Sequence, residues 1–275
     1  MDKVKRNERV AAITRVLVAE PNKVINFSTF CERFGAAKSS ISEDVGIIDA
    51  ALRAGRLGTL QTVAGAAGGV RYRPEDDRTG AHAFLSEVSA LLMDPDRLLP
   101  GGYLYLSDIL GDPVLLRRMG DIIASAWYDA RADFVLTMET KGIPVAMMAA
   151  NALGVPLVIA RRQSKVYEGS AVNINYVSGR GSIETMSLSR RAVKPGQRAL
   201  VVDDFIRGGG TARGLAALMA EFQVEVAGLS FVLAQDCPPR KPLADEKSLM
   251  VFTGDGEMEP LAVRPAPWLM ETASA

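Results

Sequence analysis

The stretch ALVVDDFIRGGGTARG, residues 199–214, decides the fold class of this chain. Its apolar run ALVV is typical of a buried strand, and GLAALMAEF, residues 214–222, has the apolar spacing of an amphipathic helix. The residues between them therefore form a loop that leads from a strand into a helix. Loops of this kind, at the carboxyl ends of parallel strands, are where open α/β folds bind ligands.

The chemistry of this loop predicts a phosphorylated sugar. Glycines free the backbone N–H groups at the start of the helix to surround an anion, with the positive end of the helix dipole behind them. The loop lacks the lysine of a Walker A motif, and its carboxylates accept hydrogen bonds from sugar hydroxyls. We therefore expect Asp203 and Asp204 to bind the diol of a ribose 5-phosphate, and the amides of Arg207 to Thr211 to bind its phosphate. The alternative is a tight structural turn with a solvated acid pair.

A second loop of similar build follows FVLTM, residues 134–138. Thr140, Lys141 and Gly142 present backbone N–H groups and one ammonium group there. Two anion-binding loops and an acid pair predict a sugar that carries phosphate at both ends. The long basic segment of residues 161–191, rich in Ser and Gly, is interpreted as a mobile cover over this ligand or as an ordinary β-excursion.

Alternating apolar strands and amphipathic helices after residue 82 predict a parallel α/β sheet. The polar residues 75–82 are interpreted as a linker, and the residues after 240 yield no prediction. The candidate strands are residues 103–106, 134–138, 156–160, 199–204 and 226–234.

Residues 1–73 predict three helices followed by a β-hairpin. The first helical pattern is followed by a short helix that Ser28 caps and Gly35 ends, and the third contains Ser40 and Glu43 at capping-box spacing. The strands GTLQTV and VRYRP then flank the turn AGAAGG. This order, with 12 basic and 7 acidic side chains and hence a net charge of +5, indicates a winged helix-turn-helix domain.

The third predicted helix and the wing carry the residues that we expect to contact DNA. The N-terminal end of such a helix enters the major groove, where lysine and serine suit phosphate contacts and short hydrogen bonds to base edges. Glycines in the wing let the backbone approach DNA closely. The alternative is that these residues only cap a helix and cover a solvated face. The candidates are Lys3, Lys5, Arg6, Lys38, Ser39, Ser40, Ser42, Gly68, Gly69 and Arg71.

Composition and residue types exclude several other classes of protein. The chain has 275 residues, 48% of them hydrophobic, which is typical of a soluble globular protein. Cys31 and Cys237 belong to no CxxC pair and His82 is the single histidine, so we expect no disulfide framework, metal site or histidine-based catalysis. Arg15 interrupts the apolar N-terminal stretch and prolines interrupt the uncharged residues 142–160, so we predict no signal peptide or transmembrane helix and a cytoplasmic protein.

The glycine loop and the strand before it resemble a known family motif. ALVVDDFIRGGGT is similar to the phosphoribosyl pyrophosphate (PRPP) motif of the type I phosphoribosyltransferases, whose fold suits residues 80–240, with METKG at the place of the pyrophosphate loop. More narrowly, the whole chain resembles the purine operon repressors of Gram-positive bacteria. The segments that carry this resemblance are AKSSISED, GTLQTVAGAAGGVRY, LPGGYLYLSDILG, TKGIP, EGSAVNINYVSG, TMSLSRR and VVDDFIRGGGT.

The resemblance implies an α/β protein with a winged helix-turn-helix DNA-binding domain, residues 1–74, and a type I phosphoribosyltransferase-like parallel-sheet domain, residues 75–275. It implies a homodimeric repressor of purine biosynthesis genes that binds double-stranded DNA at purine operon control sites. PRPP would be the effector that lowers its DNA affinity, accompanied by Mg²⁺ and in competition with a nucleotide. The implied effector-binding residues are Tyr103, Thr140, Lys141, Gly142, Asp203, Asp204, Phe205, Arg207, Gly208, Gly209, Gly210 and Thr211.

The residue at position 207 favours a ligand sensor over an enzyme. Many catalytic members of the superfamily resembled here have a third acid, three residues after the second, which assists the departing or attacking base. Arg207 stands at that position, and its permanent cation accepts no proton. We therefore expect bound PRPP not to be consumed and no residue to be catalytic. The alternative is a xanthine-like purine phosphoribosyltransferase with an accessory N-terminal domain, because xanthine-type enzymes resemble DDFLANG here and lack that acid too.

Overall fold

The structure is a computed structural model. In it, the chain folds into two compact units. One holds Met1–Asp77 with Asn151–Gly154, and the other holds Arg78–Ala150 with Val155–Ala275. The residues that it describes are 4–65, 68–74, 77–99, 103–163, 169–178, 181–236, 245–254 and 260–270.

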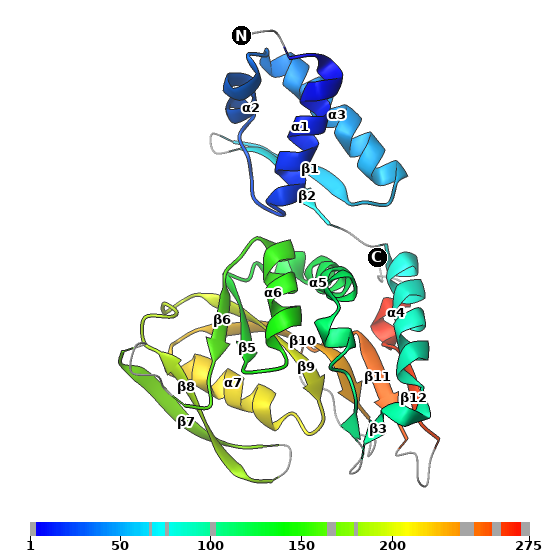
Figure 1. Ribbon diagram of the computed structural model, residues 1–275. Coiled ribbons are helices and arrows are strands. Elements are labelled where there is room, and N and C mark those ends of the chain that lie inside the picture. Colours follow the sequence, from blue (N-terminus) through cyan, green and yellow to red (C-terminus); the bar gives the residue numbers. More distant parts are fainter. Residues whose placement is uncertain are drawn as a thin grey trace. The chain divides into compact units, whose positions relative to one another are not determined.

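The smaller unit is a winged helix-turn-helix, as the sequence predicted (Figure 1). Its helices are α1 (Arg6–Ala19), α2 (Phe27–Phe34) and α3 (Lys38–Ala54). Strands β1 (Thr59–Val63) and β2 (Gly69–Arg73) pair antiparallel to form the wing. The buried side chains that hold the helices to the hairpin include Ile13, Leu17, Phe30, Ile41, Ile48 and Val70.

Two of the predicted helix caps in this unit are wrong. Asn26, and not Ser28, is the N-cap of α2, because its side chain accepts a hydrogen bond from the Ser28 amide at 2.9 Å. Helix α3 begins at Lys38 without a side-chain cap, so Ser40 lies inside its first turn and forms no capping box with Glu43. Gly35 ends α2 in a left-handed conformation, as predicted.

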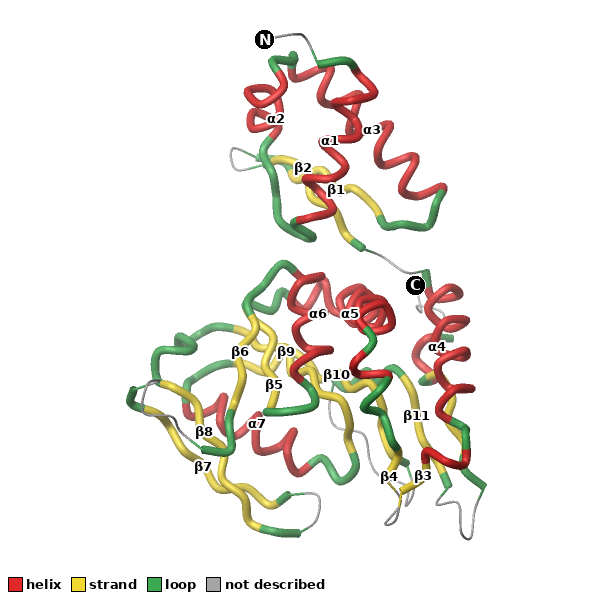
Figure 2. Tube along the Cα trace, in the orientation of Figure 1, coloured by secondary structure: helices red, strands yellow, loops and turns green. Residues whose placement is uncertain are grey.

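The larger unit is built on a six-stranded sheet with the order β12-β11-β10-β9-β5-β6 (Figures 1 and 2). All neighbouring pairs are parallel except β11 and β12, which confirms a mostly parallel sheet. The strands are β5 (Phe134–Met138), β6 (Leu157–Ala160), β9 (Arg198–Ile206), β10 (Glu225–Gln235), β11 (Met250–Thr253) and β12 (Ala262–Pro265).

Helices cover both faces of this sheet. Helix α7 (Gly210–Glu221) packs on one face through Leu215, Leu218 and Met219, which share a core with apolar side chains of β5, β9 and β10. Helices α5 (Pro113–Trp127) and α6 (Ile143–Leu153) lie on the opposite side in Figure 1. This arrangement places the first turns of α6 and α7 at the carboxyl ends of the strands that precede them.

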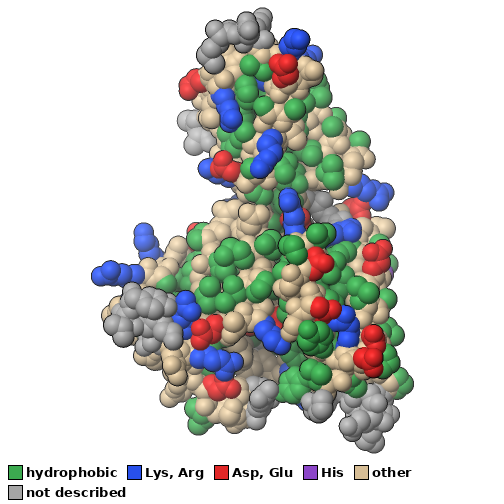
Figure 3. Space-filling view, viewed as in Figure 1, with side chains coloured by type: hydrophobic (Ala, Val, Ile, Leu, Met, Phe, Trp, Pro, Cys, Tyr) green, Lys and Arg blue, Asp and Glu red, His purple; other side chains and the backbone are tan. Residues whose placement is uncertain are grey.

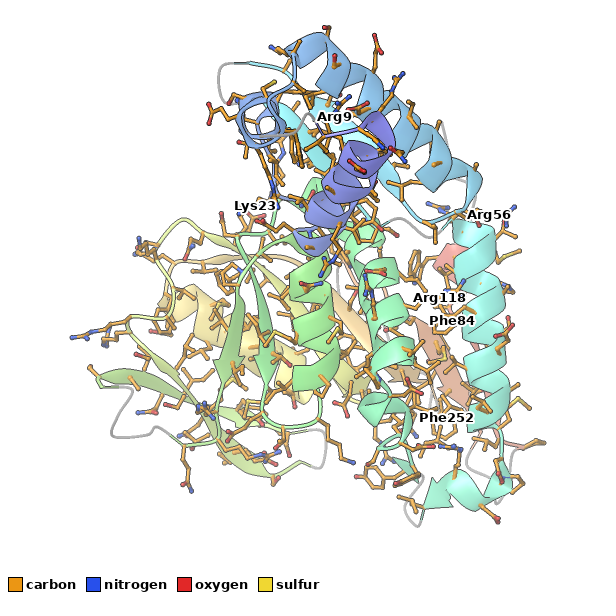
Figure 4. All side chains as sticks on the ribbon, turned by 45° about the horizontal axis from the view of Figure 1, so that its top comes forward. Arg9, Lys23, Arg56, Phe84, Arg118 and Phe252 are labelled. Atoms are coloured by element: carbon orange, nitrogen blue, oxygen red, sulfur yellow. The ribbon has the colours of Figure 1, made fainter. Side chains whose placement is uncertain are left out.

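The segment predicted as a linker contains the start of a helix. Helix α4 spans Arg78–Leu92 and buries Ala81, Phe84 and Leu85. The prediction erred because the first three residues of the helix are polar and its apolar face begins only at Ala81. Arg118 of α5 braces this helix, since its guanidinium lies 4.5 Å from the Phe84 ring and donates to the carbonyl of Gly80 (Figure 4).

Residues 103–106 do not join the central sheet, which corrects the strand prediction there. Only β4 (Tyr103–Leu104) is extended, and it pairs with β3 (Leu98–Leu99) in a separate small sheet. Two short 3-10 helices, Pro95–Arg97 and Ile109–Gly111, lie before and after this small sheet in the chain. Two further 3-10 helices are Tyr128–Ala130 and Pro267–Leu269.

The segment of residues 161–191 contains a β-hairpin, and the C-terminal residues add strands that the sequence did not predict. Strand β7 (Ala171–Val177) pairs antiparallel with β8 (Ile183–Ser189), in agreement with a β-excursion. Strands β11 and β12 extend the sheet beyond β10, and α4 packs beside β12. Among the described residues, no helix is long and apolar enough to cross a membrane.

Candidate functional site

A cavity of about 560 Å³ lies where β5 and β9 end, and it brings the two predicted anion-binding loops together. Every residue that the sequence proposed for the effector lines it, with the exception of Gly142. These lining residues are Tyr103, Thr140, Lys141, Asp203, Asp204, Phe205, Arg207, Gly208, Gly209, Gly210 and Thr211.

The glycine loop forms the N-terminus of α7. Gly209 is the N-cap residue and has a left-handed backbone with φ of 71°, which a glycine adopts without strain. Arg213 donates to the carbonyl of Gly208 at 2.7 Å and so braces the loop from within the helix. The amides of the first turn have no acceptor inside the helix, which makes this end of the cavity suited to an anion.

Asp203 is buried beside its neighbour Asp204. Its Oδ1 atom accepts a hydrogen bond from the Asp204 amide at 3.0 Å. Burial, followed by the charge and the side chain of Asp204, holds the pKa of Asp203 well above that of an exposed carboxyl, although the hydrogen bond from the Asp204 amide acts in the opposite direction. The pair therefore offers one buried and one half-exposed carboxyl group to ligand hydroxyls.

Gly142 does not line the cavity but lets the two loops touch. A Cβ added to it would lie 1.9 Å from Asp203 Oδ1 and 2.6 Å from Thr137 Oγ1. Only a residue without a side chain fits there. Thr140 and Lys141, on the cavity side of the same loop, are exposed, and the peptide bond between Glu139 and Thr140 is cis.

Tyr103 and Arg207 lie together on the cavity wall. The Arg207 guanidinium is 5.5 Å from the centre of the Tyr103 ring, a cation–π arrangement. The sequence pointed to each residue separately, but the pairing depends on the position of β4 beside the glycine loop.

Several cavity residues were missed by the sequence prediction. Arg162, Tyr176 and Glu184 come from the segment interpreted as a cover or a β-excursion, in which no ligand-binding residue was predicted, and Glu139 precedes the second loop. Tyr176 donates to Glu184 Oε2 at 3.1 Å, and Arg162 donates to the same oxygen at 2.7 Å. The basic and polar composition of the segment was a signal, but the residues that face the cavity follow from the register of β7 and β8.

In the smaller unit, most candidate DNA-contacting side chains of α3 face solvent. Lys38, Ser39 and Ser42 are exposed, and Ser40 is half-buried. Lys5 is exposed at the start of α1. Figure 3 shows basic side chains, with fewer acidic ones, on the visible face of this unit. Lys3 lies outside the described residues.

Arg6 and Arg9 of α1 are engaged with the fully buried Asp44 of α3 (Figure 4 labels Arg9). Arg6 Nε lies 3.2 Å from Asp44 Oδ1, and Arg6 also pairs with Glu43 at 3.1 Å. Arg9 donates to the other Asp44 oxygen, and this hydrogen bond raises the pKa of the Arg9 guanidinium. The role of Arg6 in contacting DNA stays a prediction, and the structure adds an internal contact that the sequence did not reveal.

Packing within the protein explains why Gly68 and Gly69 of the wing are glycines. A Cβ on Gly69 would lie 2.1 Å from the Ile25 carbonyl oxygen, and one on Gly68 would lie 2.3 Å from that of Val63. Arg71 reaches across the hairpin to donate to Gln61 Oε1 at 3.1 Å. The close approach predicted for these glycines is therefore an approach to the protein's own backbone, and their contact with DNA stays a prediction.

Comparisons with known proteins cover both units. A family model described as "Bacterial purine repressor, N-terminal" matches residues 5–74, and one described as "Phosphoribosyl transferase domain" matches residues 114–258. The chain is 42% identical over 252 residues to the purine biosynthesis transcriptional repressor PurR of Bacillus subtilis, covering 91% of this chain and 88% of that protein. It is 41% identical over 248 residues to the purine biosynthesis transcriptional activator PurR of Lactococcus lactis, covering 90% and 92%.

A solved structure shares the fold of the larger unit. The adenine phosphoribosyltransferase from Thermoanaerobacter pseudethanolicus aligns with a TM-score of 0.53 at 24% identity. The alignment covers 61% of this chain and 99% of that protein. At this identity the likeness concerns the fold alone.

Proposed function

The chain belongs to the family of bacterial purine repressors, and on that premise we propose that it is a DNA-binding transcriptional repressor of purine biosynthesis genes with PRPP as effector. The observation that supports PRPP as the effector is that the two loops and the acid pair line the same cavity. We propose the domain limits 1–74 for DNA binding and 75–275 for effector binding.

The cavity offers a partner for each group of PRPP. The carboxyl groups of Asp203 and Asp204 accept hydrogen bonds from the ribose hydroxyls. The amides of residues 207–211 bind the 5-phosphate at the N-terminus of α7, and the Thr140 to Gly142 loop with the Lys141 ammonium binds the pyrophosphate. Phe205 and Tyr103 complete the wall beside the sugar.

A magnesium ion bound with PRPP would depend mainly on the ligand. Among the described residues, no group of three or more His, Cys, Asp or Glu side chains could hold a metal by itself. Mg²⁺ commonly binds through one or two carboxylates together with substrate phosphates. The half-exposed Asp204 is suited to such a contribution, and the ion would neutralise part of the pyrophosphate charge.

We propose that bound PRPP is sensed and not consumed. Arg207 occupies the place at which many, though not all, catalytic members of the superfamily that the loop resembles carry an acid, and it is packed on Tyr103. A guanidinium neither takes a proton from a purine base nor gives one to it at neutral pH. The rival function is a purine phosphoribosyltransferase, which the shared fold favours. Release of pyrophosphate from PRPP, Mg²⁺ and xanthine would establish that rival.

We propose that a homodimer presents two winged units to DNA. The exposed N-terminal end of α3 enters the major groove, while Lys5 and Arg71 contact the sugar–phosphate backbone. PRPP lowers DNA affinity by binding more tightly to the conformation that binds DNA less well. A nucleotide that carries a pyrophosphate group would compete for the same cavity.

The test is a titration of a labelled purine operon control fragment with the protein, at fixed salt, with and without PRPP, followed by fluorescence anisotropy. We expect tight binding that PRPP weakens. The variants Asp203→Ala and Asp204→Ala should bind DNA normally and lose the PRPP response. The matched control is Asp96→Ala, because Asp96 is exposed and lies outside the cavity. A normal PRPP response in both pocket variants would refute the site, and absence of specific DNA binding would refute the function.

A further inference from the structure

A set of polar contacts runs along the cavity wall from the Thr140 loop to Tyr176 of the β7–β8 hairpin. It starts at Glu139, directly before the Thr140 loop, whose Oε1 atom accepts a hydrogen bond from the Arg162 amide at 2.7 Å. The Arg162 side chain donates to Glu184 Oε2 at 2.7 Å, and Tyr176 donates its hydroxyl to the same oxygen at 3.1 Å. Contacts of this kind hold the β7–β8 hairpin against the end of β6.

At its other end, this set of contacts reaches the helix that follows the glycine loop. Thr211, in the first turn of α7, lines the same cavity as Tyr176. One turn further along, Gly214 lies against the same tyrosine, since a Cβ added there would be 2.9 Å from Tyr176 Cγ and 2.7 Å from Met186 Cε. The hairpin therefore rests directly on the helix whose N-terminus forms the proposed phosphate site.

The buried part of these contacts is the part that matters energetically. Arg162 is largely exposed, and an exposed ion pair contributes little by itself. Tyr176 is buried, and burial followed by its hydrogen bond to Glu184 raises the pKa of its hydroxyl, which stays a neutral donor. Loss of a buried hydrogen bond to a charged group is costly, so Tyr176 and Glu184 hold each other in place.

We propose that Arg162, Glu184 and Tyr176 are positioning residues that couple the two anion-binding loops, so that the protein favours a ligand with phosphate at both ends over one with a single phosphate. This inference rests on the proposed PRPP site. Each loop loses conformational freedom when an anion binds to it. Because the hairpin links them, ordering one loop lowers the entropic cost of ordering the other.

The test compares two ligands on the full-length protein by isothermal titration calorimetry. Ribose 5-phosphate reaches only the glycine loop, whereas PRPP reaches both. In Tyr176→Phe, which keeps the ring and its packing, we expect PRPP affinity to fall about 10-fold, within the usual range of coupling between sites. Ribose 5-phosphate affinity should change by less than about twofold, because it does not depend on the coupling.

Two further variants keep the result interpretable. Glu184→Gln should reproduce the selective loss of PRPP affinity through a different residue of the same set. The matched control is Tyr105→Phe, because Tyr105 is exposed and does not line the cavity. Equal losses for both ligands, or no loss, in the Tyr176 and Glu184 variants would overturn the coupling. Failure of the unaltered protein to bind PRPP would instead refute the proposed function.

Discussion

Replacing Gly142 with alanine tests whether the two anion-binding loops meet as the structure shows. The new Cβ would lie 1.9 Å from Asp203 Oδ1, 2.9 Å from Asp203 Cγ and 2.6 Å from Thr137 Oγ1. Gly142 does not have a left-handed φ, so alanine meets no backbone strain there. The collision of one methyl group with the neighbouring loop is therefore the whole perturbation.

The size of the effect follows from that collision. Overpacking a tight site costs about 1–3 kcal/mol, and each kcal/mol lowers the melting temperature of a unit of this size by roughly 2–4 °C. Asp203 must move, and a lost hydrogen bond between its carboxyl and a ligand hydroxyl is worth about 1.5–3 kcal/mol. We therefore expect Gly142→Ala to unfold several degrees lower and to bind PRPP roughly 10- to 100-fold more weakly.

Calorimetry of PRPP binding and thermal unfolding measure both effects. Gly111→Ala is the matched control, because no atom lies within 4 Å of a Cβ at that exposed glycine. In an Asp203→Ala background, Gly142→Ala should cost less stability, since two of the three colliding atoms are then absent. Unchanged melting temperature and PRPP affinity in Gly142→Ala would refute the close approach of the loops.

Three further predictions concern the buried ion pair, the wing and pH. Asp44→Ala should destabilise the smaller unit by about 3–5 kcal/mol, because the mostly buried Arg9 guanidinium loses the carboxylate that it pairs with. Hydrogen exchange of the α3 amides measures this loss, and unchanged protection would contradict the prediction. Arg71→Ala should weaken binding to all DNA sequences and reduce the salt slope by about 0.9 if it neutralises one phosphate, and an unchanged slope argues against the wing. The raised pKa of Asp203 means that its protonated form stabilises the ligand-free fold below about pH 4, and that this stability is lost as pH rises through the raised pKa. Asp203→Asn should remove this part of the pH dependence in thermal unfolding; an identical pH profile would show that Asp203 titrates normally.

Local patterns in the sequence were sufficient for the elements that are contiguous in the chain. Strand β5 has the predicted bounds, and β9 differs from the prediction by a few residues at its ends. The prediction failed where short polar stretches hid the start of a helix, as at Arg78, and where an apolar run proved too short for the sheet, as at β4. Tertiary packing overrides local propensity at such points.

The sequence by itself determined the fold class, the two loops and the acid pair, because strand, glycine loop and helix follow one another within a few residues. Only the tertiary structure decided which distant groups share the cavity. Tyr176 and Glu184 reach it through the register of one hairpin, in which a shift by one residue would turn each side chain to the other face, and Arg162 reaches it from the end of β6. Likewise, Gly142 must be glycine because Asp203, far along the chain, occupies the space of its missing side chain.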